Sequence, residues 1–158
     1  MVNKEGVFVK KNKRIFVASD HAGVKVKEYV CKFFEDNGIS YEDFSPDNKS
    51  SDDYPDFAIQ VSKEVVKSKS LGVLICGTGI GMSIAANKQK GIRAALCHAP
   101  KDALTSRSHN DANILVLSNA NTKSNVYKML DAFLSADFLK GRHLRRVNKI
   151  KKFESVLK

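Results

Sequence analysis

Short apolar runs and helical patterns alternate along most of the chain. Each apolar run is nearly continuous and is bounded by polar residues or glycine, which predicts strands at residues 14–19, 39–44, 71–75, 92–97 and 113–118. Apolar positions at intervals of three and four predict helices at about 23–37, 54–68, 81–90, 101–108, 123–136 and 144–157. Strand and helix patterns therefore take turns along one chain.

Five apolar strands separated by helices predict a parallel sheet that is covered on both faces. This arrangement is a three-layer α/β/α domain, Rossmann-like in architecture, with a five-stranded parallel sheet. A chain of 158 residues that is 42% hydrophobic can bury one good core. We therefore expect a single domain over residues 14–158, preceded by a basic N-terminal extension at residues 1–13.

The three cysteines, Cys31, Cys76 and Cys97, are widely spaced and form no Cys-x-x-Cys pair. This pattern argues against a disulfide framework and against a zinc site, and it favours a reducing cytoplasm. Neither a signal peptide nor a membrane span is apparent in the sequence. The sequence therefore predicts a soluble, cytoplasmic protein that has no membrane partner.

The net charge of the chain is +10, from 27 Lys and Arg residues against 17 Asp and Glu residues. The lysines are scattered over the predicted helices and are not interleaved with aromatic residues, and no nucleic-acid-binding motif is present. We therefore interpret the excess as a solvated surface that suits a small phosphorylated substrate, and we expect no nucleic-acid partner.

The stretch LGVLICGTGIGMSIAANK, residues 71–88, is a predicted strand that runs into three alternating glycines, Gly77, Gly79 and Gly81. A dinucleotide fingerprint would need a further glycine where Met82 stands, and a P-loop would need a Gly-Lys pair that the loop lacks. Unpaired backbone N–H groups at the start of the following helix favour negative charge. The loop is therefore predicted to bind an anion, or to stabilise one that forms in a reaction.

Cys76 stands immediately before this loop. Removal of a proton from a carbon next to a carbonyl creates an oxyanion, and a thiolate near a helix N-terminus can act as the base. An inert buried thiol is the alternative interpretation. Cys31, on the apolar face of a predicted helix, and Cys97, at the end of a predicted strand, are both expected to be buried and slow to react.

Other polar residues follow the predicted strands, where ligands bind in parallel sheets. Asp20 and His21 follow the first strand, His98 follows the fourth, and His109 and Asn110 come one helix later. Each also has a structural interpretation. Asp20 could cap a helix, His109 and Asn110 could close a turn, and the stretch GRHLRR at residues 141–146 could be a basic helix start.

Taken together, the motifs resemble a known family. SDHAG, DYPDFA, ICGTGIGMSIAANK, GIRAAL, SRSHNDAN and GRHLRRV occur in the order and at about the spacing seen in the type B ribose 5-phosphate isomerases, within the ribose/galactose isomerase family. The resemblance spans about residues 14–150. It implies an aldose–ketose isomerase that interconverts ribose 5-phosphate and ribulose 5-phosphate through an enediolate. No metal or organic cofactor is implied, and the assembly is a homodimer or homotetramer with shared active sites.

The resemblance also implies a role for each matching residue. Cys76 is the base that moves a proton between C2 and C1 of the sugar, Thr78 lies beside the reacting carbons, and His109, from a neighbouring subunit, opens the furanose ring as an acid. Asp20, Tyr54 and Asn110 contact the sugar. The enediolate is held by the glycine loop and a serine near it, at Gly77, Thr78, Gly79, Ile80, Gly81 and Ser83.

Phosphate binding is assigned by the resemblance to His21, Arg142 and Arg146. One departure concerns the turn after the fifth strand, where family members usually have an arginine and this chain has Ala120. One phosphate contact is therefore in question.

Two other functions remain open at this point. The protein could isomerise another phosphosugar, such as galactose 6-phosphate or allose 6-phosphate. It could also be a non-catalytic nucleotide-binding or regulatory domain built on the same type of sheet. A nucleotide-binding domain would not need Cys76.

Overall fold

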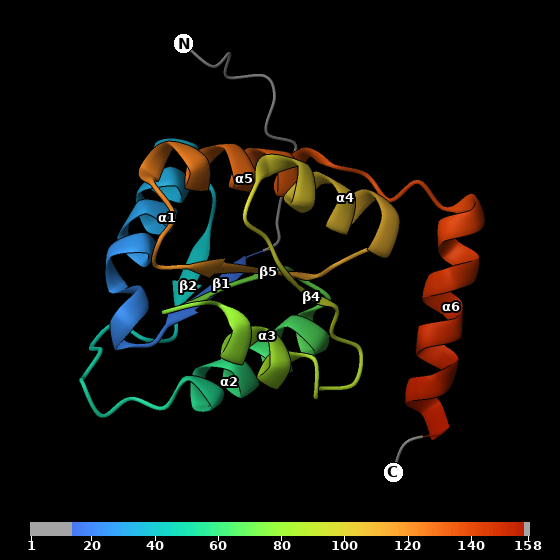
Figure 1. Cartoon of the computed structure of the whole chain (residues 1–158), viewed down its shortest axis with the longest axis horizontal. Coiled ribbons are helices and arrows are strands. Elements are labelled where there is room, and N and C mark those ends of the chain that lie inside the picture. The colour runs from blue at the N-terminus through green and yellow to red at the C-terminus, as the bar shows by residue number, and fades with distance from the viewer. Residues whose placement is uncertain (1–13, 157–158) are drawn as a thin grey trace.

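A computed structural model describes residues 14–156. The extension expected at residues 1–13 and the end of the last predicted helix lie outside these residues. Five strands form one parallel sheet in the order β2-β1-β3-β5-β4 (Figure 1). They are β1 (Ile15–Ser19), β2 (Tyr41–Asp43), β3 (Gly72–Cys76), β4 (Ala94–Leu96) and β5 (Ile114–Ser118).

Helices cover both faces of the sheet, which confirms the predicted three-layer α/β/α fold (Figure 1). One face is covered by α1 (Val24–Asp36), α4 (Pro100–Asn110) and α5 (Lys123–Ser135), and the other by α2 (Tyr54–Ser68) and α3 (Ile80–Ala86). A short 3-10 helix, η1 (His21–Gly23), precedes α1. The last helix, α6 (Gly141–Val156), stands outside these layers and contacts α4. No helix of the described part is both long and apolar enough to cross a membrane.

Side chains of each central strand alternate between two apolar clusters, one on each face of the sheet. In β3, Val73 and Ile75 pack with the helices α1 and α5, whereas Leu74 and Cys76 pack with α2 and α3. Because both clusters are buried, the strands need apolar residues at nearly every position. This explains the continuous apolar runs of the sequence.

The strand order predicts a ligand site at the carboxyl ends of β1 and β3. The chain leaves β1 through α1 toward β2, and it leaves β3 through α3 toward the opposite side of the sheet. A crevice at the carboxyl ends of two such strands is the usual ligand site of a parallel sheet. Asp20 follows β1 at this edge and Gly77 follows β3.

Three element boundaries differ from the prediction in ways that affect the site. β3 includes Cys76, so this residue is the last of the strand and does not belong to the loop. α4 extends to Asn110, so His109 and Asn110 are helical, and the hypothesis that they close a turn is wrong. α6 begins at Gly141 and so contains the whole GRHLRR stretch. The remaining predicted elements agree with the structure to within a few residues.

Gly23 fixes how closely η1 approaches the sheet. A Cβ atom at this position would lie 2.8 Å from both Cγ2 and the carbonyl oxygen of Ile75, which real Cβ atoms do not tolerate. The Asp20–Gly23 turn can therefore lie against the end of β3 only because residue 23 has no side chain.

We expect the substitution Gly23→Ala to lower the free energy of unfolding by about 1–3 kcal/mol, the usual cost of overpacking a core. Urea denaturation followed by circular dichroism measures this change. Lys25→Ala, on the exposed side of the following helix, is the control and should change the free energy by less than about 0.5 kcal/mol. Equal stability of Gly23→Ala and the wild type would show that the turn can move away from β3 at no cost.

Candidate active site

Cys76 lies at the carboxyl end of β3, opposite Ser118 of β5. Its side chain is buried, and its sulfur accepts a hydrogen bond from the backbone N–H of Gly79, with 3.2 Å between N and Sγ. A backbone donor thus faces the sulfur at the point where β3 passes into the loop before α3. The geometry therefore suits Cys76 to act as a base.

The glycines of the loop are required by the backbone conformation and by close neighbours. Gly79 has φ +80°, and a Cβ atom there would lie 2.4 Å from Cδ1 of Leu96. At Gly81 a Cβ atom would lie 2.5 Å from Cζ of Tyr54, the first residue of α2. The Tyr54 ring therefore packs directly on the backbone of the loop. A substrate bound at the loop would lie beside this ring.

The N–H groups of the loop are not all available for an enediolate in this structure. The N–H of Gly79 is directed at Cys76, and the N–H of Ile80 donates to Oγ1 of Thr78 at 3.2 Å. Thr78 and Ile80 are exposed, and Ser83 is half-buried one turn into α3. The N–H of Gly79 is thus directed at the Cys76 sulfur, which the sequence did not indicate.

Asp20 is the N-cap of η1. Its Oδ1 atom accepts hydrogen bonds from the N–H groups of Ala22 at 3.0 Å and Gly23 at 3.1 Å. The capping interpretation of the sequence is therefore confirmed, and a role toward the sugar would be additional to it. Asp20 is buried and His21 is exposed, both at the same edge as Cys76, because Asp20 donates its N–H to the carbonyl oxygen of Ile75 at 3.2 Å.

His109 and Asn110 lie at the other edge of the sheet. They form the last turn of α4, and the carbonyl oxygen of Asn110 accepts a hydrogen bond from Nε of Arg93, which precedes β4. The adjacent strand β5 starts at this edge and ends beside Cys76, about 13 Å away at 3.3 Å per residue. His109 and Cys76 therefore lie at opposite edges of the sheet.

His143, which the sequence analysis did not assign, packs on His109. The two rings are stacked with their centroids 4.2 Å apart and their planes 11° apart, and His143 is buried. Burial lowers the pKa of His143, and the nearby His109, Arg142 and Arg146 lower it further. The GRHLRR stretch contains this residue, but only the tertiary structure pairs it with His109.

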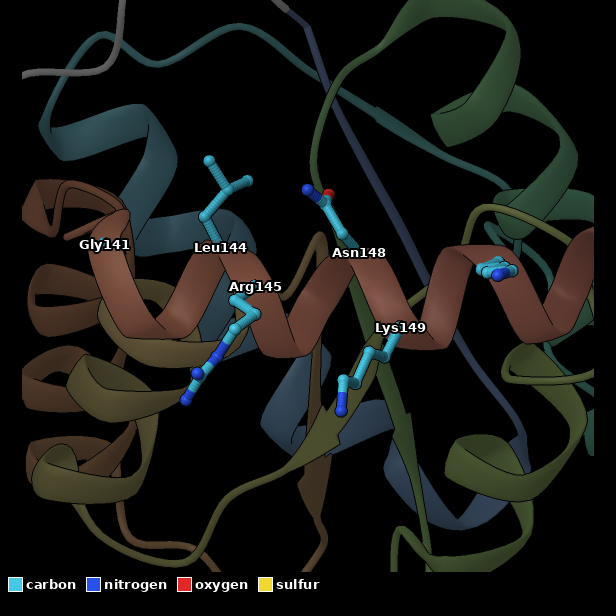
Figure 2. A pocket seen from close by; sticks show the side chains of 6 residues that line it. Gly141, Leu144, Arg145, Asn148 and Lys149 are labelled. Atoms are coloured by element: carbon cyan, nitrogen blue, oxygen red, sulfur yellow. The ribbon is translucent and has the colours of Figure 1, made fainter.

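Arg142 and Arg146 lie on the exposed surface of α6. An open hollow of about 450 Å³ also follows this helix (Figure 2), and it is lined by Gly141, Leu144, Arg145, Asn148, Lys149 and Lys152. Neither Arg142 nor Arg146 belongs to this lining. Because α6 contacts α4, Arg142 and Arg146 lie at the same edge of the sheet as His109, which is the edge remote from Cys76.

The turn after β5 does reach the site. The N–H of Asn119 donates to the carbonyl oxygens of Cys76 at 3.0 Å and Gly77 at 3.1 Å, and the neighbouring Ala120 is exposed. The position at which the family usually has an arginine therefore lies next to the glycine loop.

The other two cysteines differ from Cys76. Burial raises the pKa of Cys97 to about 11. Cys31 is partly exposed, so the expectation that it would be buried is wrong, although partial burial still raises its pKa. Within residues 14–156, no three His, Cys, Asp or Glu side chains are grouped so that they could hold a metal ion.

Comparisons with known proteins agree with these motifs. The model of the family described as Ribose/Galactose Isomerase matches residues 15–150. The chain is 44% identical over 144 residues to a probable ribose-5-phosphate isomerase B of Mycoplasma genitalium, covering 89% of this chain and 95% of that protein. It is 39% identical over 144 residues to the ribose-5-phosphate isomerase B of Escherichia coli, covering 90% of this chain and 97% of that protein.

Solved structures give the same result. A crystal structure of ribose-5-phosphate isomerase B from Mycoplasma genitalium with bound ribulose-5-phosphate matches with a TM-score of 0.87 at 42% identity, covering 91% of this chain and 97% of that one. The ribose-5-phosphate isomerase B of Clostridium thermocellum matches with a TM-score of 0.87 at 41% identity, covering 90% and 98% of the two chains. The resemblance expected from the motifs is confirmed: the chain belongs to the ribose/galactose isomerase family.

Proposed function

We propose that this protein is an aldose–ketose isomerase that interconverts ribose 5-phosphate and ribulose 5-phosphate. The hydrogen bond from Gly79 N–H to the Cys76 sulfur carries the proposal, because it prepares a base at the mouth of an anion-stabilising loop. Two relatives named ribose-5-phosphate isomerase B, and the related structure with bound ribulose-5-phosphate, support the choice of substrate.

The reaction needs one base that serves two adjacent carbons. The Cys76 thiolate removes the proton from C2 of the open-chain aldose, and the electron pair of the C1 carbonyl moves to O1. Backbone N–H groups of the loop stabilise the resulting enediolate. The thiol then returns the proton to C1 while the proton on O2 passes to O1, which leaves a carbonyl at C2 and a hydroxyl at C1. Atoms and charges balance without an added reductant or oxidant.

The complete site is formed between two copies of the chain. Since Cys76 and His109 lie at opposite edges of one sheet, the His109 that opens the sugar ring belongs to a second copy. Arg142 and Arg146 come with it, because α6 packs beside α4. The assembly is therefore a homodimer, or a homotetramer built from such dimers. The three unpaired cysteines of each chain fit a reducing cytoplasm.

The phosphate group of the sugar binds to His21 of one copy and to Arg142 and Arg146 of the other. All three side chains are exposed in the single chain, and the two arginines carry positive charge. Ala120 leaves this end of the site without the arginine that is usual in the family. The family also includes isomerases of galactose phosphates, so turnover should be compared with galactose 6-phosphate and allose 6-phosphate.

We expect iodoacetamide at neutral pH to modify Cys76 before the other two thiols. Although Cys31 is more exposed, its raised pKa and that of Cys97 keep both as thiols, whereas Cys76 has a donor directed at its sulfur. Peptide mapping by mass spectrometry follows the three sites while activity is assayed. Ribose 5-phosphate should protect Cys76. Full activity after complete alkylation of Cys76 would exclude this residue as the base.

The shared site predicts complementation between two inactive variants. Cys76→Ala and His109→Ala should each be nearly inactive. A 1:1 mixture should regain about a quarter of wild-type activity after subunit exchange, because half of the dimers are mixed and each mixed dimer has one intact site. Native mass spectrometry confirms the exchange. If exchange is complete and no activity returns, the two residues act within one chain.

The arginines of α6 can be tested separately, because Arg145 lines the hollow whereas Arg142 and Arg146 do not. Arg142→Ala and Arg146→Ala should each lower kcat/KM for ribose 5-phosphate by about 10- to 150-fold, which corresponds to the 1.5–3 kcal/mol of a charge-assisted hydrogen bond. Turnover of unphosphorylated ribose should change much less. Arg145→Ala, which removes an arginine that lines the hollow, is the control and should retain activity. Equal losses on both sugars would assign the arginines to folding or assembly.

A further inference from the structure

A buried lysine lies beneath the loop that leads to Tyr54. Lys27 is on α1, and its side chain is only 7% exposed. Its ammonium group forms an ion pair with Asp43 at the end of β2, with 2.9 Å between Nζ and Oδ2. A buried charge is costly unless it is paired and fully hydrogen-bonded, so the remaining contacts of this group are informative.

The other partners of Lys27 lie in the loop after β2. Nζ donates to the carbonyl oxygen of Ser45, to Oγ of Ser45 at 3.1 Å and to Oδ1 of Asn48 at 3.1 Å. An ammonium group has three N–H donors. Asp43, Ser45 and Asn48 together offer the Lys27 ammonium group at least three acceptors. The loop thus wraps around the charge of Lys27.

The same loop residues hold the end of β1. The N–H of Ser19 donates to Oγ of Ser45 at 2.8 Å, and the side-chain amide of Asn48 donates to the carbonyl oxygen of Ser19 at 2.7 Å. Both backbone polar groups of the residue before Asp20 are therefore bound to partners of Lys27. The position of Asp20 at the site depends on this network.

The network also extends toward Tyr54. Nδ2 of Asn48 donates to Oδ2 of Asp52 at 3.2 Å, and the same oxygen accepts the N–H of Lys49 at 2.6 Å. Asp52 comes two residues before Tyr54, whose ring packs on Gly81. A continuous set of contacts therefore joins a lysine on α1 to the loop that presents Tyr54 to the glycine loop.

We propose that Lys27 is a positioning residue for the isomerase reaction. Acting through Ser45 and Asn48, it holds Asp20 and Tyr54 at the carboxyl edge in the arrangement that receives the sugar. Lys27 does not itself contact the reacting carbons, because its ammonium group is enclosed by Asp43 and the loop. The inference rests on the proposed function and adds to it a residue that determines substrate binding.

The test compares Lys27→Met and Asn48→Ala with the wild type. Since the network positions groups that contact the sugar, KM for ribose 5-phosphate should rise by about fivefold or more, while kcat should change by less than about threefold. Amide hydrogen exchange should become faster in peptides that cover residues 44–57. Should Lys27→Met fail to fold, Asn48→Ala decides the question, because Asn48 is only partly buried.

Two controls separate positioning from loss of charge or of stability. Lys25→Met removes an exposed positive charge from the same helix, and Met129→Ala weakens the core on α5. Both should keep the wild-type KM. A rise of KM in Met129→Ala equal to that in Asn48→Ala would show that lower stability alone produces the effect, and it would overturn the inference.

A double variant tests whether the effect passes through Tyr54. In a Tyr54→Ala background, Asn48→Ala should raise KM by less than about twofold further, since residues in one network are not additive. Full additivity would overturn this route. A wild-type protein without turnover of ribose 5-phosphate would overturn the proposed function, whereas turnover with unchanged KM in Lys27→Met and Asn48→Ala would overturn the positioning role alone.

Discussion

The common direction of all five strands is the constraint on which the rest of this structure depends. In a parallel sheet every loop that follows a strand lies at one edge, and every helix that leads into the next strand ends at the other. Asp20 and Asn119 follow strands and Cys76 is the last residue of one, so the three meet at the carboxyl edge. His109 ends a helix that leads into β5, so the same rule places it at the remote edge. This placement is the reason for proposing a site that is shared between two chains.

At the carboxyl edge, the backbone of the glycine loop determines the surroundings of Cys76. Gly79 adopts a left-handed conformation and lies against Leu96 with no room for a side chain, and this conformation turns its N–H toward the sulfur of Cys76. In the proposed reaction, this loop serves both the Cys76 base and the enediolate that the base creates. In that reaction Cys76 becomes a neutral thiol when it takes the proton, and the enediolate beside it then carries the negative charge. A negative thiolate and a negative enediolate are therefore never present together.

Different interactions hold the two edges in place. At the carboxyl edge a buried ion pair between Lys27 and Asp43 holds the loop that follows β2, and this loop is otherwise polar and half-exposed. At the amino edge α6 meets the domain through the buried side chains of His143 and Val147 and through Glu154, which accepts a hydrogen bond from the N–H of Gly91, whereas its other side chains are exposed. The first arrangement fixes the loop at the edge where the sugar is proposed to bind. The second leaves the basic side chains of α6 exposed.

Much of the fold followed from the sequence because burial on both faces of a parallel sheet requires continuous apolar strands, and amphipathic helices show their period directly. The glycine loop and Cys76 could also be identified, since glycine spacing and a strand-to-helix junction are local features. Local patterns could not show that Gly79 donates to Cys76, that His143 stacks on His109, or that Lys27 is buried beneath the loop leading to Tyr54. Each of these contacts joins segments whose distance is set by strand order or by a backbone turn. Only the tertiary structure decides them, because a hydrogen bond or a ring contact depends on positions in space that the hydrophobic period does not encode.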